Sequence, residues 1–141
     1  MKKVLIAAEG GPLTETVIQN GITLARSMHA EIGLVYVAEA TGFAGEGGYT
    51  IQNFIQDLHK NALDLFARLK SEFDIQQSWT FIEDGNPAKK IVETADTWKA
   101  DYIVVGTHGR TGLSHLLMSS VAEHVIRHSK IPVLVITEEH K

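Results

Sequence analysis

The sequence predicts an α/β fold: a doubly wound sheet of five parallel strands in the order 3-2-1-4-5, with four helices distributed over both faces. Two observations predict it. Short continuous apolar runs, typical of strands buried on both faces, alternate with stretches whose apolar residues recur at the helical period. Such alternation implies right-handed crossovers and a parallel sheet. The 141 residues suit one domain, which we expect to span residues 1–141.

The first half of the chain is predicted to contain two strands and two helices. The strands lie at residues 4–8 and 32–37, and Pro12 opens the first helix, where its missing N–H is not needed. The second helix follows the glycine-rich loop 40–49 and has Thr50 as its N-cap. Its regular apolar stripe indicates core packing and comprises Ile51, Phe54, Ile55, Leu58, Ala62, Leu65, Phe66, Leu69 and Phe73.

The second half is predicted to contain three strands, at residues 78–82, 102–105 and 131–136. Asn86 and Pro87 provide the cap and the first position of the third helix. The last helix is expected to carry two adjacent apolar lines: Leu117, Val121 and Val125, and Met118, Ala122 and Ile126. We expect four aromatic side chains in the core: Phe54, Phe66, Trp79 and Phe81.

Composition argues against several functional classes. The net charge is −4 and the basic residues are scattered, so the electrostatic footprint of a nucleic-acid-binding protein is missing. Without cysteine, neither disulfides nor thiolate metal sites can form. The apolar run at residues 4–8 is too short for a signal peptide, and no run approaches the length of a membrane span. We therefore expect a cytoplasmic protein with no membrane partner.

In a doubly wound sheet, ligands bind beyond the carboxyl ends of the strands where the winding reverses, here between the first and fourth strands. The loops expected there are Glu9-Gly10-Gly11 and the glycine-rich stretch 106–116. The second loop is suited to an anion, because glycines let backbone amides approach it and a helix start follows. The residues concerned are Gly106, Gly109, Arg110, Gly112, Ser119 and Ser120.

Plainer interpretations stay open. The loop could be a connector without a ligand, and Glu9 could be a solvated carboxylate instead of a ribose contact. The loop contains neither the P-loop motif nor the GxGxxG fingerprint, which argues against both of those classes. His124 and His128 have the spacing of a metal pair, but no third ligand is evident, so a solvated helix face is favoured.

The pattern Gly106-x2-Gly109-x9-Ser119-Ser120 resembles the G-x2-G-x9-G-[ST] nucleotide signature of the universal stress proteins. The resemblance covers the whole chain. VLIAAEGG is similar to the family's opening strand, GNPAKKIVETADTWKADYIVVGTHGRTGL to its central segment, and SSVAEHVIRHSKIPVLVI to its closing segment.

The resemblance implies an adenine nucleotide α-hydrolase-like fold and a cytoplasmic stress-response protein of regulatory or protective character. It implies a homodimer that pairs through the last strand, Ile131 to Ile136. It also implies ATP, with or without Mg²⁺, as a ligand that some members bind. By position, the expected contacts are Ala7, Glu9, Val37, Gly106, Thr107, Gly109, Arg110, Gly112, Ser119, Ser120 and Val121.

Three departures from the family pattern bear on ATP. Glu9 replaces an aspartate with the same charge, and Gly10-Gly11 replaces Gly-Ser. Ser119 replaces the last glycine of the signature, and its side chain would crowd a phosphate or strain a positive φ at a cost of about 1 kcal/mol.

Three functions follow: an ATP-binding, non-catalytic dimer; an interaction dimer whose site is empty or weakened; or a slow ATPase or autophosphorylating protein.

Overall fold

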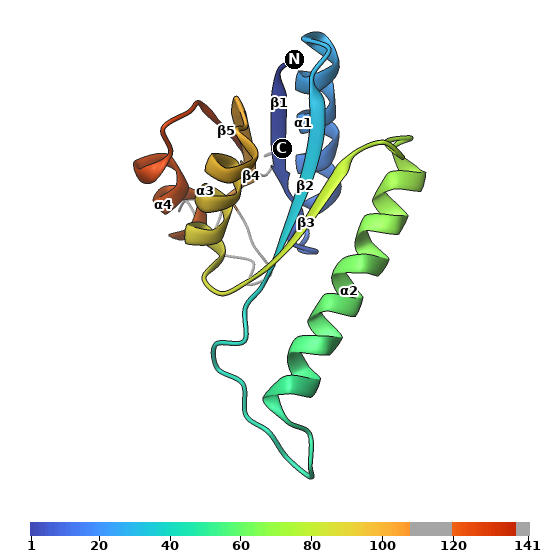
Figure 1. The fold of residues 1–141 in the computed structure, drawn as a ribbon, viewed down its shortest axis with the longest axis vertical. Coiled ribbons are helices and arrows are strands. Elements are labelled where there is room, and N and C mark those ends of the chain that lie inside the picture. The colour runs from blue at the N-terminus through green and yellow to red at the C-terminus, as the bar shows by residue number, and fades with distance from the viewer. Residues whose placement is uncertain (108–119, 138–141) are drawn as a thin grey trace.

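The computed structural model describes residues 1–107 and 120–137. They form one parallel sheet in the order β3-β2-β1-β4-β5 with four helices (Figure 1), as predicted. In chain order the elements are β1 (Lys3–Ala7), α1 (Thr14–Ser27), β2 (Glu31–Ala38), α2 (Ile51–Glu72), β3 (Trp79–Asp84), α3 (Pro87–Trp98), β4 (Tyr102–Gly106), α4 (Ser120–His128) and β5 (Val133–Ile136).

The sheet has an apolar core on each face, because successive strand residues point to opposite sides. Val4 and Ile6 of β1 pack with α1 and α2, whereas Leu5 and Ala7 pack with α3 and α4. Figure 1 shows α3 and α4 together on one side of the sheet and α2 on the other. The predicted coverage of both faces is therefore confirmed. None of the described helices has the length and apolarity to cross a bilayer.

Two predicted helix caps are present. The Thr50 hydroxyl accepts a hydrogen bond from the Asn53 amide at 3.1 Å, and the Thr50 amide donates to the Asn53 side-chain oxygen at 3.1 Å. At the start of α3, the Asn86 side-chain oxygen accepts from the Lys89 amide at 3.0 Å, and Pro87 occupies the first turn. Each cap satisfies amides that have no partner within the helix.

Three predicted boundaries differ from the structure by two residues: the starts of α1 and β5, and the end of β3, which continues to Asp84 instead of ending at residue 82. Helix α1 begins at Thr14, not at Pro12. The Gly11 carbonyl accepts hydrogen bonds from both the amide and the hydroxyl of Thr14, and these bonds close a turn that contains the proline. Strand β5 begins at Val133, not at residue 131. Pro132 has no N–H to donate, although its carbonyl still accepts from the Ile103 amide at 3.1 Å.

Three side chains predicted on buried faces are exposed: Ile51 is 47%, Trp79 55% and Ile126 43% accessible. Ile51 lies in the part of α2 that extends beyond the strands (Figure 1). Trp79 begins β3, an edge strand, and its indole N–H donates to the Glu31 carboxylate at 3.2 Å. Of the other aromatic predictions, Phe66 is buried, and Phe54 and Phe81 are partly buried against the core.

The loop between β2 and α2 is attached to the first turns of α2. The rings of Phe43 and Phe54 stack with their centroids 5.1 Å apart. The Tyr49 hydroxyl donates to the Asp57 carboxylate, and this hydrogen bond, with smaller effects of burial and of the Asp57 charge, raises the pKa of Tyr49. The loop follows the carboxyl end of β2 and extends away from the sheet on that side (Figure 1).

Candidate functional site

The carboxyl ends of β1 and β4 lie side by side at the point where the winding reverses. Val4 pairs with Tyr102 and Ile6 with Val104, so Ala7 and Gly106 end at the same edge. The loops that leave these two strands therefore start from neighbouring positions. This is the convergence on which the sequence-based interpretation depends.

A small hollow of about 10 Å³ opens at this edge. We call it the rim hollow; it is lined by Ala7, Glu9, Leu13, Thr14, Val17 and Gly106. Its walls are mainly apolar, and the Thr14 hydroxyl already donates to the Gly11 carbonyl at 2.8 Å. Glu9 is the ionisable group among these lining residues. The volume is far below that of a nucleotide, so the rim hollow by itself is too small to hold one.

The Glu9 carboxylate can accept hydrogen bonds from ligand hydroxyls, the role that an acidic residue has in dinucleotide folds. The turn after it depends on Gly10, whose φ is +74°, a value that L residues rarely adopt. A Cβ at Gly10 would meet no atom of residues 1–107 and 120–137 within 4 Å. Among these residues, glycine is therefore required there by the backbone conformation and not by crowding.

Three other predicted contacts are placed by the strands and by α4. Val37 is buried near the carboxyl end of β2, close in register to Glu9, because Val35 pairs with Ala7. Thr107 is buried and its amide donates to the Ile136 carbonyl at 2.9 Å, so this amide serves the sheet and not an anion. Val121 lies in the first turn of α4 and packs against the core on the α3 side.

Gly109, Arg110, Gly112 and Ser119 lie outside the described residues, as does His108. Ser120 is the first residue of α4, which agrees with its expected place at a helix start. The anion cradle in this loop thus stays a prediction.

The histidine pair on α4 is held by local contacts. The rings of His124 and His128 stack with centroids 4.0 Å apart, and the His128 Nδ1 lies 2.9 Å from the His124 carbonyl oxygen. Within residues 1–107 and 120–137, no three His, Cys, Asp or Glu side chains come close enough together to hold a metal ion. The described contacts of the pair are thus within α4 itself.

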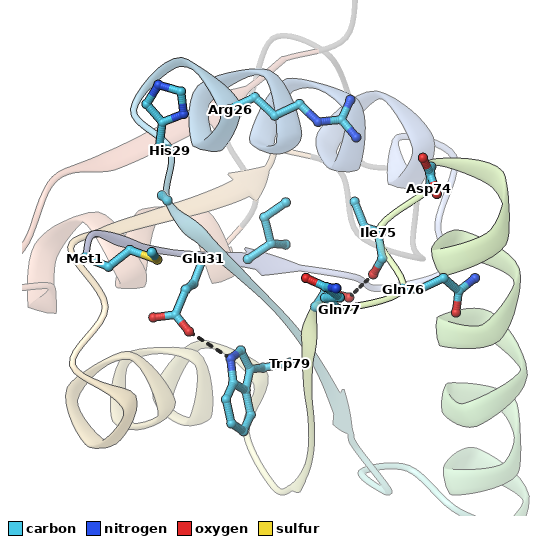
Figure 2. Close-up of a pocket in the computed structure, with 12 residues that line it drawn as sticks. Met1, Arg26, His29, Glu31, Asp74, Ile75, Gln76, Gln77 and Trp79 are labelled. Atoms are coloured by element: carbon cyan, nitrogen blue, oxygen red, sulfur yellow. Dashed lines mark hydrogen bonds between the residues drawn. The ribbon is translucent and has the colours of Figure 1, made fainter.

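A larger hollow, of about 710 Å³, was not anticipated from the sequence. Figure 2 shows that it lies between the last turn of α1, the segment after α2, and the first residues of β2 and β3. This is the amino end of the sheet, opposite the rim hollow. The Arg26 guanidinium donates one hydrogen bond to the Phe73 carbonyl at 3.4 Å, and the Trp79 indole donates to the Glu31 carboxylate at 3.2 Å, so both side chains already have a partner within the protein.

Comparison with known proteins supports the resemblance seen in the motifs. The model of the universal stress protein family matches residues 1–137. A universal stress protein of Methanocaldococcus jannaschii is 34% identical, covering 99% of this chain and 84% of the relative.

Solved structures agree with the fold. The universal stress protein UspA from Lactobacillus plantarum superposes with a TM-score of 0.84 at 17% identity, covering 96% of this chain and 97% of that one. A family member from Arabidopsis thaliana, solved with AMP bound, has a TM-score of 0.69 at 18% identity and covers 99% and 93%. Another universal stress protein, solved in complex with cAMP, has a TM-score of 0.65 at 21% identity and covers 96% of each chain.

Proposed function

The chain belongs to the universal stress protein family, and from this premise we propose that it binds an adenine nucleotide at the carboxyl edge of the sheet. The observation that carries the proposal is the rim hollow, where Gly106 lines the same space as Ala7 and Glu9 although it is distant from them in the chain. The Glu9 carboxylate accepts hydrogen bonds from the ribose hydroxyls, and the apolar side chains beside it contact the nucleoside.

What two structural relatives hold supports an adenine nucleotide as the ligand. One was solved with AMP and the other with cAMP, and both ligands contain adenosine and one phosphate. We propose ATP, with or without Mg²⁺, as the ligand of this chain, with its phosphates on the loop that carries Gly109, Arg110 and Gly112 and on the start of α4. Ser119 and Ser120 complete that contact.

The proposed role is regulatory or protective binding in the cytoplasm and not catalysis. Phosphoryl transfer requires a bound metal, a placed cation and a residue that orients the nucleophile. Among the residues that line the rim hollow, Glu9 is the ionisable side chain, and a carboxylate that binds the ribose is not positioned at the phosphates. A slow ATPase or an autophosphorylating protein is therefore the less favoured alternative.

Replacing Ser119 with glycine should tighten ATP binding about tenfold, because the change restores the last glycine of the signature and removes a side chain from the phosphate contact. Isothermal titration calorimetry with ATP and Mg²⁺ on both proteins measures the two dissociation constants. Release of ligand by denaturation, identified by mass, tests for a nucleotide carried through purification. The proposal fails if neither protein binds millimolar ATP and the purified protein releases no nucleotide.

We also propose that the chain forms a homodimer through β5. This strand is an edge of the sheet, and an edge presents unpaired backbone groups that favour pairing. Its side chains are apolar: Leu134 is 38% accessible, and Val133 and Val135 are half-buried. An exposed apolar edge of this kind is suited to a second copy of the same strand.

Introducing a charge at this edge should separate the dimer. We expect Leu134→Asp to raise the dimer dissociation constant at least tenfold, because the carboxylate would be buried without a partner. Sedimentation equilibrium measures it. Leu63→Asp is the matched control, since Leu63 is exposed on α2, far along the chain from β5. Equal dissociation constants for Leu134→Asp and the unmodified protein would place the interface elsewhere.

A further inference from the structure

A third cavity, of about 410 Å³, lies between β3 and α3 at the outer edge of the sheet. We call it the edge cavity. It shares no residue with the rim hollow, and its volume is within the range of small-molecule sites. The side chains that give it a chemical character are Phe81, Glu83, Lys90, Glu93, Thr94 and Trp98.

Two aromatic rings form an apolar wall of the edge cavity. The centroids of Phe81 and Trp98 are 5.5 Å apart and the ring planes are inclined by 60°. Gly33 of β2 makes room for both: a Cβ there would lie 2.8 Å from the Trp98 ring and 3.1 Å from the Phe81 ring. The faces of such rings attract organic cations and the alkyl groups attached to them.

The charges on the cavity lining are unbalanced. Lys90 pairs with Glu93, with 3.4 Å between the ammonium nitrogen and a carboxylate oxygen. Glu83, on the same side of β3 as Phe81, is half-buried and has no ion-pair partner among residues 1–107 and 120–137. Among the lining residues, the Glu83 carboxylate is therefore left without an ion-pair partner and is partly shielded from solvent. The Lys3 ammonium, which is not among the lining residues, lies 5.4 Å from the centroid of the Trp98 ring and donates to the Trp98 carbonyl at 3.1 Å.

Thr94 supplies a second and independent sign of a ligand. It lines the edge cavity and is 7% accessible, and its hydroxyl forms no hydrogen bond with any residue in the described part of the chain. Buried hydroxyls in proteins are nearly always hydrogen-bonded, because leaving one unsatisfied is costly. A donor from a bound molecule would satisfy this oxygen.

We propose that the edge cavity binds a small organic cation that carries N–H donors on a short alkyl chain, an alkylguanidinium or a primary alkylammonium. Its N–H groups donate to the Glu83 carboxylate and the Thr94 hydroxyl, and its alkyl chain lies on Phe81 and Trp98. An anion would be repelled by the unpaired carboxylate. A quaternary ammonium would lack the donors that Glu83 and Thr94 require.

Trp98 can report on binding directly. The chain has two tryptophans, and Trp79 lies outside the edge cavity, so Trp79→Phe leaves Trp98 as the single indole fluorophore. In this background, titration with n-butylguanidinium and n-butylammonium should change the Trp98 emission saturably. Butylurea, the neutral isostere of butylguanidinium, and tetramethylammonium should each bind at least tenfold more weakly.

Two isosteric variants test the assigned contacts. Glu83→Gln and Thr94→Val should each weaken butylguanidinium binding, Glu83→Gln by about tenfold, with thermal unfolding recorded to verify folding. Glu46→Gln, a change of the same charge in the loop between β2 and α2, should leave binding unchanged. Three outcomes would overturn the assignment. Butylurea could bind with the same affinity as butylguanidinium, a folded Glu83→Gln protein could bind butylguanidinium with unchanged affinity, or neither cation could give a saturable response.

Discussion

Ile6→Ala is expected to lower the free energy of unfolding by about 2–5 kcal/mol, and the midpoint of thermal unfolding by roughly 6–15 °C. Ile6 lies in β1 and is fully buried against the face that α1 covers. Removing its outer carbons loses their transfer free energy and leaves a cavity. The size of the effect depends on whether neighbouring atoms can move into that cavity.

At this position they cannot move far. A Cβ on Gly21 would lie 2.5 Å from the Ile6 Cδ1, so the backbone of α1 lies directly on this side chain. Gly21 has no side chain that could rotate into the space, and β1 is held on both sides by β2 and β4. We therefore expect a destabilisation in the upper part of the range.

Ile51→Ala is the matched control. It is the same substitution at an isoleucine that the helical pattern predicts to be buried and the structure places 47% exposed. This substitution should change the free energy of unfolding of the protein by no more than about 0.5 kcal/mol, as is usual for surface substitutions. Chemical denaturation of the three proteins gives the values. Similar losses for Ile6→Ala and Ile51→Ala would contradict the structure and favour the interpretation from periodicity.

Ile51 and Trp79 show where sequence-based prediction of this fold ends. Alternating strand and helix patterns identify the elements and their order, because each face of the sheet must be covered by an apolar stripe. Periodicity indicates which side of a helix is apolar but not how far the opposing sheet extends. Helix α2 continues beyond the strands, and Trp79 lies on an edge strand, so both side chains remain exposed.

The candidate site also has parts that the sequence predicts and parts that it does not. The convergence of the loops after β1 and β4 follows from strand order alone, and the rim hollow lies there. That the Thr107 amide is used by Ile136 could not be foreseen, because it depends on the register between β4 and β5. The edge cavity joins Phe81 of β3 and Trp98, the last residue of α3, which belong to no sequence motif.

Glu9→Gln is expected to weaken ATP binding by roughly 10–100-fold, because hydrogen bonds to a charged acceptor contribute about 1.5–3 kcal/mol. The contribution of the ribose hydroxyls can be separated from that of the charge with 2′,3′-dideoxy-ATP, which lacks both hydroxyls. If Glu9 acts through them, the substitution should change the affinity for this analogue by less than about threefold, so the two losses would not add. Calorimetric titration of both proteins with both nucleotides completes the cycle.

The direction in which ATP affinity changes distinguishes a direct contact with Glu9 from a long-range effect of its charge. ATP is an anion, so removing a nearby negative charge should strengthen its binding if charge alone is at work. Glu39→Gln tests this, since Glu39 directly follows β2 at the same edge of the sheet and should leave affinity equal or slightly higher. A direct contact at Glu9 predicts the opposite sign, despite the reduced repulsion. Glu9→Gln binding ATP as tightly as Glu39→Gln would show that the carboxylate lies beside the nucleotide without touching it.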